Sequence, residues 1–235
     1  MSGRASQRLR LAALVSLLAA CATPPDFRAL PADTTPPLRP PSAAPQATRY
    51  TVDAERSEIR FLVFREGPLA ALGHNHVVQA QGVVGEIYLA AEFSQSQFWL
   101  SIPVAGLVVD AAAARAQEGE QFASAPDAEA IASTTKNMVG DRVLQAGRYP
   151  RIDVRSVALG GSASAPLLTV RIKLGAAQRN LTIPVAVAYL DQEIRVTAQF
   201  EIKQSDFGIA PFSVLGGAIR VADTVKVRLQ IVAGR

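Results

Sequence analysis

The chain has 235 residues and a formal net charge of +4, and 49% of its residues are hydrophobic against 19% charged. Most of this charge comes from three arginines among the first ten residues, and without the first twenty residues the net charge falls to +1. Lysine and arginine do not cluster with aromatic residues, so the basic balance does not indicate a nucleic-acid-binding protein.

Residues 1–20 are predicted to be a secretory signal peptide. Arg4, Arg8 and Arg10 precede an apolar run over residues 11–20, which is too short to span a bilayer. This order of charge and hydrophobicity is typical of a segment that directs export and is then removed.

Cys21 is predicted to carry a lipid anchor. The sequence Leu18-Ala19-Ala20-Cys21 resembles the bacterial lipobox, whose cysteine is acylated and becomes the first residue of the mature protein. Ala22 and Thr23 lack the aspartate that resembles an inner-membrane retention signal, so we expect an outer-membrane lipoprotein facing the periplasm. The alternative is an ordinary signal peptide with a coincidental cysteine. Cys21 is the only cysteine, which excludes an intrachain disulfide.

Residues 21–48 are predicted to be the lipidated cysteine and a disordered linker. Eight of the fifteen prolines lie between residues 22 and 48, where apolar residues show no periodicity. Residues 49–235 remain, which is enough for one domain with a sizeable core.

The first part of the domain is expected to form three extended segments. Residues 57–65 alternate between apolar and polar faces, with Leu62 on the polar face. Residues 76–89 are expected to form a second segment, with Gly82 and Gly85 at a bulge or a sharp bend. The alternating apolar residues are Ile59, Phe61 and Val63 in the first segment and Phe98, Leu100 and Ile102 in the third, which ends at Pro103.

Residues 110–147 are predicted to interrupt the strands with a helical excursion. Residues 124–127, Ser-Ala-Pro-Asp, are typical of a capped helix start with proline in the first turn. The helix is expected to continue to Gly140, because Ile131, Thr135 and Met138 follow at helical spacing. A second turn is expected through Val143 and Leu144.

The second half of the domain is predicted to be a run of antiparallel strands. Residues 152–157 form one strand, residues 166–203 form three more in a meander, and residues 225–231 form the last. Apolar faces of this length must be covered, so the sheet must pack on a second sheet or close on itself. The predicted fold is all-β, an antiparallel β-barrel of about eight strands with one helical excursion, and a β-sandwich is the alternative.

The inward-facing side chains of this barrel are predicted to be apolar and of medium size. An eight-stranded barrel either fills with its own side chains or holds one slender ligand, and the alternation fits both. The wall that would bind an apolar ligand consists of Ile59, Phe61, Val63, Phe98, Leu100, Val170, Ile172, Val185, Val187, Phe200 and Val227.

His74 and His76 are the two histidines of the chain and flank Asn75. Two imidazoles two residues apart on extended backbone project to one face, so they are workable metal ligands. A metal site would need a further donor, for which Glu118, Glu120 and Asp127 are candidates. The alternatives are a glycine turn with exposed histidines, or a contact from His74, Asn75 and His76 to the polar head of a bound ligand. We predict the head-group contact and no resident metal.

No catalytic residue is predicted. Residues 133–136, Ser-Thr-Thr-Lys, and residues 206–208, Asp-Phe-Gly, match fragments of enzyme motifs whose companion elements are missing. Glu118 and Glu120 fit a solvated surface better than acid/base chemistry. We expect a binding protein without a catalytic cofactor, not an enzyme.

Six short motifs in order resemble the YceI-like polyisoprenoid-binding family over about residues 49–233. The resemblance implies a lipocalin-like barrel in the bacterial envelope, whose tunnel holds an isoprenoid chain such as a polyprenyl phosphate or a quinone tail, and no catalytic residues. The chain departs from the family at residues 73–76, where members usually carry a glycine and an aromatic residue, and in its lipoprotein anchor. The motifs are Tyr50-Thr51-Val52-Asp53, Gly140-Asp141-Arg142-Val143-Leu144, Tyr149-Pro150-Arg151-Ile152, Asn180-Leu181-Thr182-Ile183-Pro184-Val185, Ser205-Asp206-Phe207-Gly208-Ile209 and Asp223-Thr224-Val225.

Overall fold

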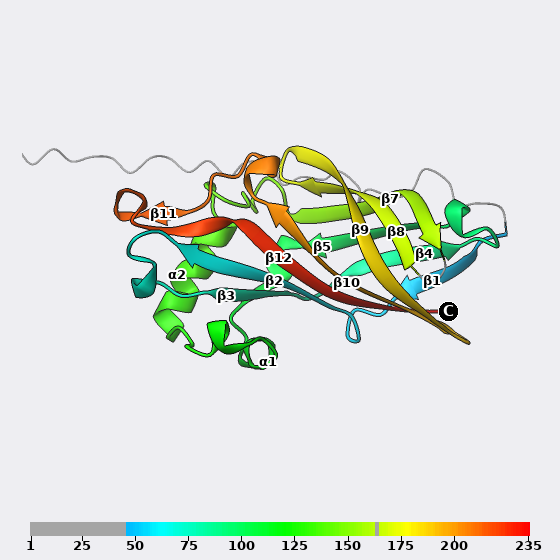
Figure 1. Ribbon diagram of the computed structural model, residues 1–235, viewed down its shortest axis with the longest axis horizontal. Helices are drawn as coiled ribbons and strands as arrows, with labels where there is room; N and C mark the ends of the chain where they lie inside the picture. Colours follow the sequence, from blue (N-terminus) through cyan, green and yellow to red (C-terminus); the bar gives the residue numbers. More distant parts are fainter. Residues whose placement is uncertain (1–45, 163–164) are drawn as a thin grey trace, which may run out of the picture.

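The computed structural model describes residues 46–162 and 165–235, so the predicted signal peptide, Cys21 and nearly all of the predicted linker lie outside the described residues. Strands wrap around the long axis of the molecule, and the helical excursion lies at one end (Figure 1). The helices are α1 (Ala112–Ala116) and α2 (Ala128–Val139), with 3-10 turns η1 (Ala70–Leu72), η2 (Phe93–Gln95), η3 (Val104–Gly106), η4 (Glu120–Phe122), η5 (Ser205–Phe207) and η6 (Leu215–Gly217). The strands are β1 (Thr48–Val52), β2 (Glu58–Glu66), β3 (His76–Ala80), β4 (Val84–Leu89), β5 (Gln97–Pro103), β6 (Leu107–Val109), β7 (Arg151–Ser162), β8 (Ala165–Leu174), β9 (Ala177–Leu190), β10 (Glu193–Lys203), β11 (Ser213–Val214) and β12 (Ile219–Gly234).

Eight strands form a closed antiparallel barrel, which confirms the predicted fold class. The ring runs β1-β4-β5-β7-β8-β9-β10-β12 and closes where Thr51 of β1 lies opposite Gly234 of β12. β12 has 16 residues, which is long enough to pair with β10 along one edge and with β2 and then β1 along the other. Closure removes the free edges of this ring, whereas β6, which pairs with β3 alone among the described strands, keeps one edge unpaired.

The meander predicted over residues 166–203 is confirmed as β8, β9 and β10. Side chains alternate between the two faces of these strands, so every second residue points into the barrel. In β10, Val196, Ala198 and Phe200 point inward, and the residues between them, Thr197 and Gln199, are exposed on the outside. The inward pairs of the β10–β12 ladder that line the barrel are Val196 and Ile231, Ala198 and Leu229, Phe200 and Val227, and Ile202 and Val225.

Three parts of the wall are each broken into two strands, and the sharp bend expected at Gly82 is one of these breaks, whereas Gly85 lies inside β4. The extended segment expected over residues 76–89 is two strands, β3 and β4, separated by a turn in which Gly82 has a φ of 69°. β5 and β6 are separated in the same way by η3, and β1 and β2 by a turn closed by the Ser57 N–H bond to the Asp53 carbonyl at 3.0 Å. β1, β4 and β5 pair with each other at one end, whereas β2, β3 and β6 pair with each other at the other.

The helical excursion contains one predicted helix and one that is not predicted. α2 ends before Gly140 as expected, but it begins after Asp127, not Ser124. The Asp127 carboxylate accepts a hydrogen bond from the Ala130 N–H at 2.8 Å and is therefore the N-cap. Val143 and Leu144 lie in a turn in which the Val143 N–H donates to the Gly140 carbonyl at 3.2 Å, and α1 is absent from the prediction.

A second, smaller core lies outside the barrel wall, against α1. The alternation of β2 places Leu62 on the polar face, but the structure buries it to 2% exposure. Leu62 packs with Val77 of β3, Ala114 of α1 and Phe122. The expectation that Leu62 faces water is therefore wrong, because α1 covers this part of the outer face.

Within the described part of the chain, no helix combines the length and the apolar character needed to cross a membrane.

Candidate ligand-binding cavity

The barrel interior holds a cavity of about 250 Å³. By the same measure a single buried water needs only about 10–15 Å³, so this space is far larger than a packing defect. The wall side chains are those that the strand alternation turns inward, supplemented at one end by Met138 of α2 and by Val143 and Leu144 after it. The interior is therefore hollow, and the alternative of a barrel filled by its own side chains does not agree with this cavity.

All eleven residues predicted for the inner wall line this cavity. They come from both halves of the domain, from β2 through β12, so the period-two pattern places them correctly without knowledge of strand pairing. Other apolar residues of the lining are Val78, Ile87, Leu89, Phe93, Ile102, Leu107, Ile152, Val154, Leu159, Leu168, Leu174, Ile183, Ile194, Val196, Ala198, Ile202, Ile209, Val225, Leu229 and Ile231.

The cavity lining is almost free of polar groups. Among the described residues that line it, only Ser96, Gln97, Tyr189 and Gln204 are polar, and none is charged. Burying an unpaired charge in such surroundings is strongly unfavourable, whereas an apolar chain gains free energy by leaving water. The interior therefore suits an uncharged, hydrophobic guest.

His76 lies in a buried polar cluster and not on the cavity wall. Its Nδ1 is 2.6 Å from Asp110 Oδ2, and Asp110 Oδ1 accepts from the Val77 N–H at 2.9 Å and from Arg115 Nη1 at 2.5 Å. Arg115 also donates to the carbonyls of Asn75, Phe122 and Ser124 at 2.6–2.9 Å. Burial by itself raises the pKa of Asp110, but the hydrogen bonds from His76, Val77 and Arg115 outweigh it and hold that pKa below its usual value. The hydrogen bonds of this cluster connect the start of β3 to α1 and to the residues that follow α1.

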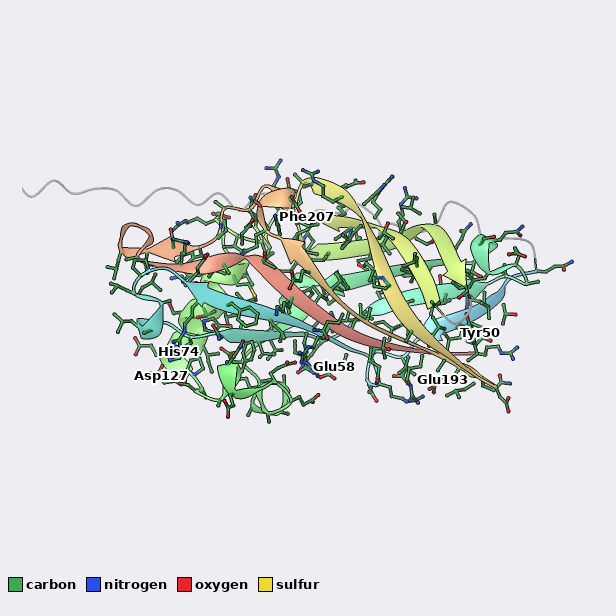
Figure 2. All side chains as sticks on the ribbon, in the orientation of Figure 1. Tyr50, Glu58, His74, Asp127, Glu193 and Phe207 are labelled. Carbon is green, nitrogen blue, oxygen red and sulfur yellow. The ribbon has the colours of Figure 1, made fainter. Side chains whose placement is uncertain are left out.

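His74 and Asn75 are also absent from the residues that line the cavity. Asn75 Oδ1 accepts from the Arg65 N–H at 3.0 Å, and Asn75 Nδ2 donates to the Gln121 carbonyl at 2.9 Å. The His74 ring is 6.4 Å from the His76 ring and tilted by 58°, at the helical end of the molecule (Figure 2). This geometry gives the predicted head-group role of His74, Asn75 and His76 no support.

The carboxylates considered as further metal ligands are engaged elsewhere. Glu118, expected on a solvated surface, has a side chain only 1% exposed, and it pairs with Arg60 Nε at 2.8 Å and with Arg228. Asp127 caps α2, and Glu120 is exposed. Among the residues described, no three His, Cys, Asp or Glu side chains come together as metal ligands would. The expectation that Glu118 is solvated is wrong, because Arg60 and Arg228 hold it against the outer faces of β2 and β12.

The sequence model of the YceI-like domain matches residues 50–233. The chain belongs to the YceI-like family. BcnA of Burkholderia cenocepacia has a similar structure, with 16% identity and a TM-score of 0.58 over 77% of this chain and 98% of that protein. The YCEI protein of Campylobacter jejuni is 12% identical, with a TM-score of 0.50 over 67% of this chain and 84% of that protein. A comparison with curated protein sequences finds no match.

At these identities the two solved structures establish the fold alone, a YceI-like, lipocalin-like barrel. That fold is consistent with binding a hydrophobic ligand. The buried pair of Asp110 and Arg115 is not predicted from the sequence, because the two residues carry no motif and become neighbours only when β3, α1 and the segment after α1 assemble.

Proposed function

We propose that this YceI-like protein binds the chain of a polyisoprenoid or a quinone-like lipid in its barrel, for transport, storage or stress protection in the cell envelope. The observation that carries the proposal is the large apolar cavity without a charged residue in its described lining. Each 100 Å² of ligand surface that leaves water contributes roughly 2.5 kcal/mol, so a chain of several isoprene units outweighs the cost of ordering it. The proposed role is binding without catalysis.

Ala198→Phe tests this role, because Ala198 lines the cavity and a phenyl ring there occupies ligand space. Gln199→Phe is the matched control, since Gln199 is the next residue of β10 and is exposed outside. We expect Ala198→Phe to weaken binding of a fluorescent polyprenol at least about tenfold, the cost of roughly 1.4 kcal/mol. Equal binding by Ala198→Phe and the wild type would contradict the proposal, as would repeated recovery of lipid-free wild type by native mass spectrometry from bacterial envelopes.

We further propose that the mature protein is an outer-membrane lipoprotein facing the periplasm, anchored through acylated Cys21. The lipobox-like sequence before Cys21 supports this proposal. Several acyl chains hold a protein on a bilayer, at about 0.8 kcal/mol per buried methylene, where one chain alone gives only marginal binding. Cys21→Ala is expected to release the protein into the soluble periplasmic fraction, and unchanged membrane association of this variant would argue against the anchor.

A further inference from the structure

A second cleft, of about 430 Å³, lies beside the cavity. It is bounded by the segment after α2, by the turn between β8 and β9, and by the end of η5 at Phe207 (Figure 2). The residues around it are Arg142, Val143, Leu144, Gln145, Arg148, Tyr149, Leu174, Gly175, Ala176, Ala177, Arg179, Phe207, Gly208 and Ile209.

The cleft adjoins one end of the apolar cavity. Val143, Leu144, Leu174 and Ile209 line both spaces, so these four apolar side chains form a shared boundary. A chain that reached this end of the cavity would have its terminal group beside the cleft.

The cleft carries three arginines and no acidic residue in its described lining. Arg142 stacks on Phe212 at 4.9 Å, Arg148 on Tyr149 at 5.1 Å, and Arg179 donates to the Gln178 carbonyl at 2.8 Å. Within the described residues none of the three pairs with a carboxylate, whereas Arg60 and Arg115 do. The aspartates next to the cleft in sequence, Asp141 and Asp206, are exposed and do not line it.

Guanidinium groups match phosphate oxygens in both geometry and charge, and stacking on an aromatic ring leaves their N–H groups free to donate. A phosphate head beside these three exposed arginines would gain charge-assisted hydrogen bonds that a neutral head could not make. We propose that this cleft is the head-group site for an acidic amphiphile, a prenyl phosphate or diphosphate, whose chain occupies the cavity. This inference rests on the proposed lipid-binding function and selects a charged head over a quinone.

The test compares geranylgeranyl diphosphate with geranylgeraniol, which shares its chain but has a neutral head, in direct titrations at low and high salt. We expect the triple variant R142Q/R148Q/R179Q to bind the diphosphate about tenfold or more weakly and the alcohol within about twofold of wild type, a size that allows for solvent screening at exposed arginines. The wild-type preference for the diphosphate should shrink as salt is added, because exposed charges are screened.

R49Q/R56Q/R220Q is the matched control, since it removes the same charge from three exposed arginines elsewhere. Inorganic diphosphate and a long-chain fatty acid complete the comparison. Equal binding of diphosphate and alcohol by wild type, or an unchanged preference in R142Q/R148Q/R179Q, would overturn the head-group site and leave the lipid-binding function standing. Equally tight inorganic diphosphate would reassign the cleft to a free anion, and an equally tight fatty acid would overturn the choice of phosphate. Failure of wild type to bind either prenyl compound would overturn the proposed function itself and the head-group site with it.

Discussion

Asp110 connects three parts of the chain through one carboxylate. Its side chain is fully buried, its backbone has a φ of 55°, and its two oxygens bind His76, the Val77 N–H and Arg115. Few non-glycine residues adopt positive φ, and those that do are held there by their surroundings. We infer that Asp110 anchors the strand–helix junction.

Asp110→Asn is expected to destabilise the domain by about 3 kcal/mol, because it leaves the buried Arg115 guanidinium without its counter-charge. The pKa of Asp110 is lower in the folded chain than in the unfolded one, so its contribution is complete above the unfolded value and is lost as pH falls through the folded value. The difference between wild type and variant in urea unfolding should therefore be constant near neutral pH and shrink below about pH 4. Asp141→Asn, at an exposed site, is the control, and a difference that is unchanged at pH 3 would contradict this account.

One double variant distinguishes the three roles considered for His74 and His76, which are a structural contact, a ligand head-group contact and a metal site. Because His74 and His76 are outside the lining of both the cavity and the cleft, we expect H74A/H76A to bind prenyl lipids within about twofold of wild type, with some loss of stability from the broken contact to Asp110. Calorimetry with Zn²⁺ and Cu²⁺ tests the metal role. Sub-micromolar metal binding that is lost in the variant and weakens as pH falls through about 6.5 would establish a metal site, and weakened lipid binding would restore the head-group role.

At the scale of elements, the broken strands depend on a close backbone contact. The Gln81 N–H donates to the Gly106 carbonyl at 2.8 Å, and a Cβ on Gly106 would lie only 2.3 Å from the Gln81 carbonyl oxygen. The break between β3 and β4 therefore packs directly on the break between β5 and β6, and a hydrogen bond joins the two.

Gly106→Ala is expected to destabilise the domain by about 1–3 kcal/mol, the usual cost of forcing atoms into a packed site. Gly147→Ala is the matched control, because a Cβ there meets nothing within 4 Å, and it should be neutral or slightly stabilising. Thermal unfolding measures both. Equal stability of the two variants would show that the backbone at the breaks moves freely.

The elements that the sequence predicts correctly are those whose pattern is local. β8, β9, β10 and β12 show a long period of two, and α2 shows helical spacing that ends at a glycine, so neighbouring residues specify each element. β6 has three residues and α1 five, which is too short for a periodic signal. Leu62 and Glu118 are likewise buried by partners distant in sequence, so neither burial is visible in the local pattern.

At the scale of the whole molecule, a ligand held in the cavity would stabilise the folded barrel. An empty apolar space forgoes packing contacts, and the lining residues come from strands all around the ring. A ligand that binds only the folded barrel stabilises it by RT ln(1 + [L]/Kd), about 2.7 kcal/mol at one hundred times Kd. Lipid-free protein should therefore be measurably less stable than the lipid-bound protein.

Delipidated wild type is expected to unfold at lower temperature than the same protein saturated with a prenyl lipid, with a difference that grows with lipid concentration. Ala198→Phe should lose this response, because the phenyl ring occupies the ligand space, whereas Gln199→Phe should keep it. Calorimetric scans of the three proteins with and without lipid measure the effect. A lipid response that is the same in Ala198→Phe and wild type would place the bound lipid outside the barrel, since a ligand held on the outer surface is indifferent to the volume inside.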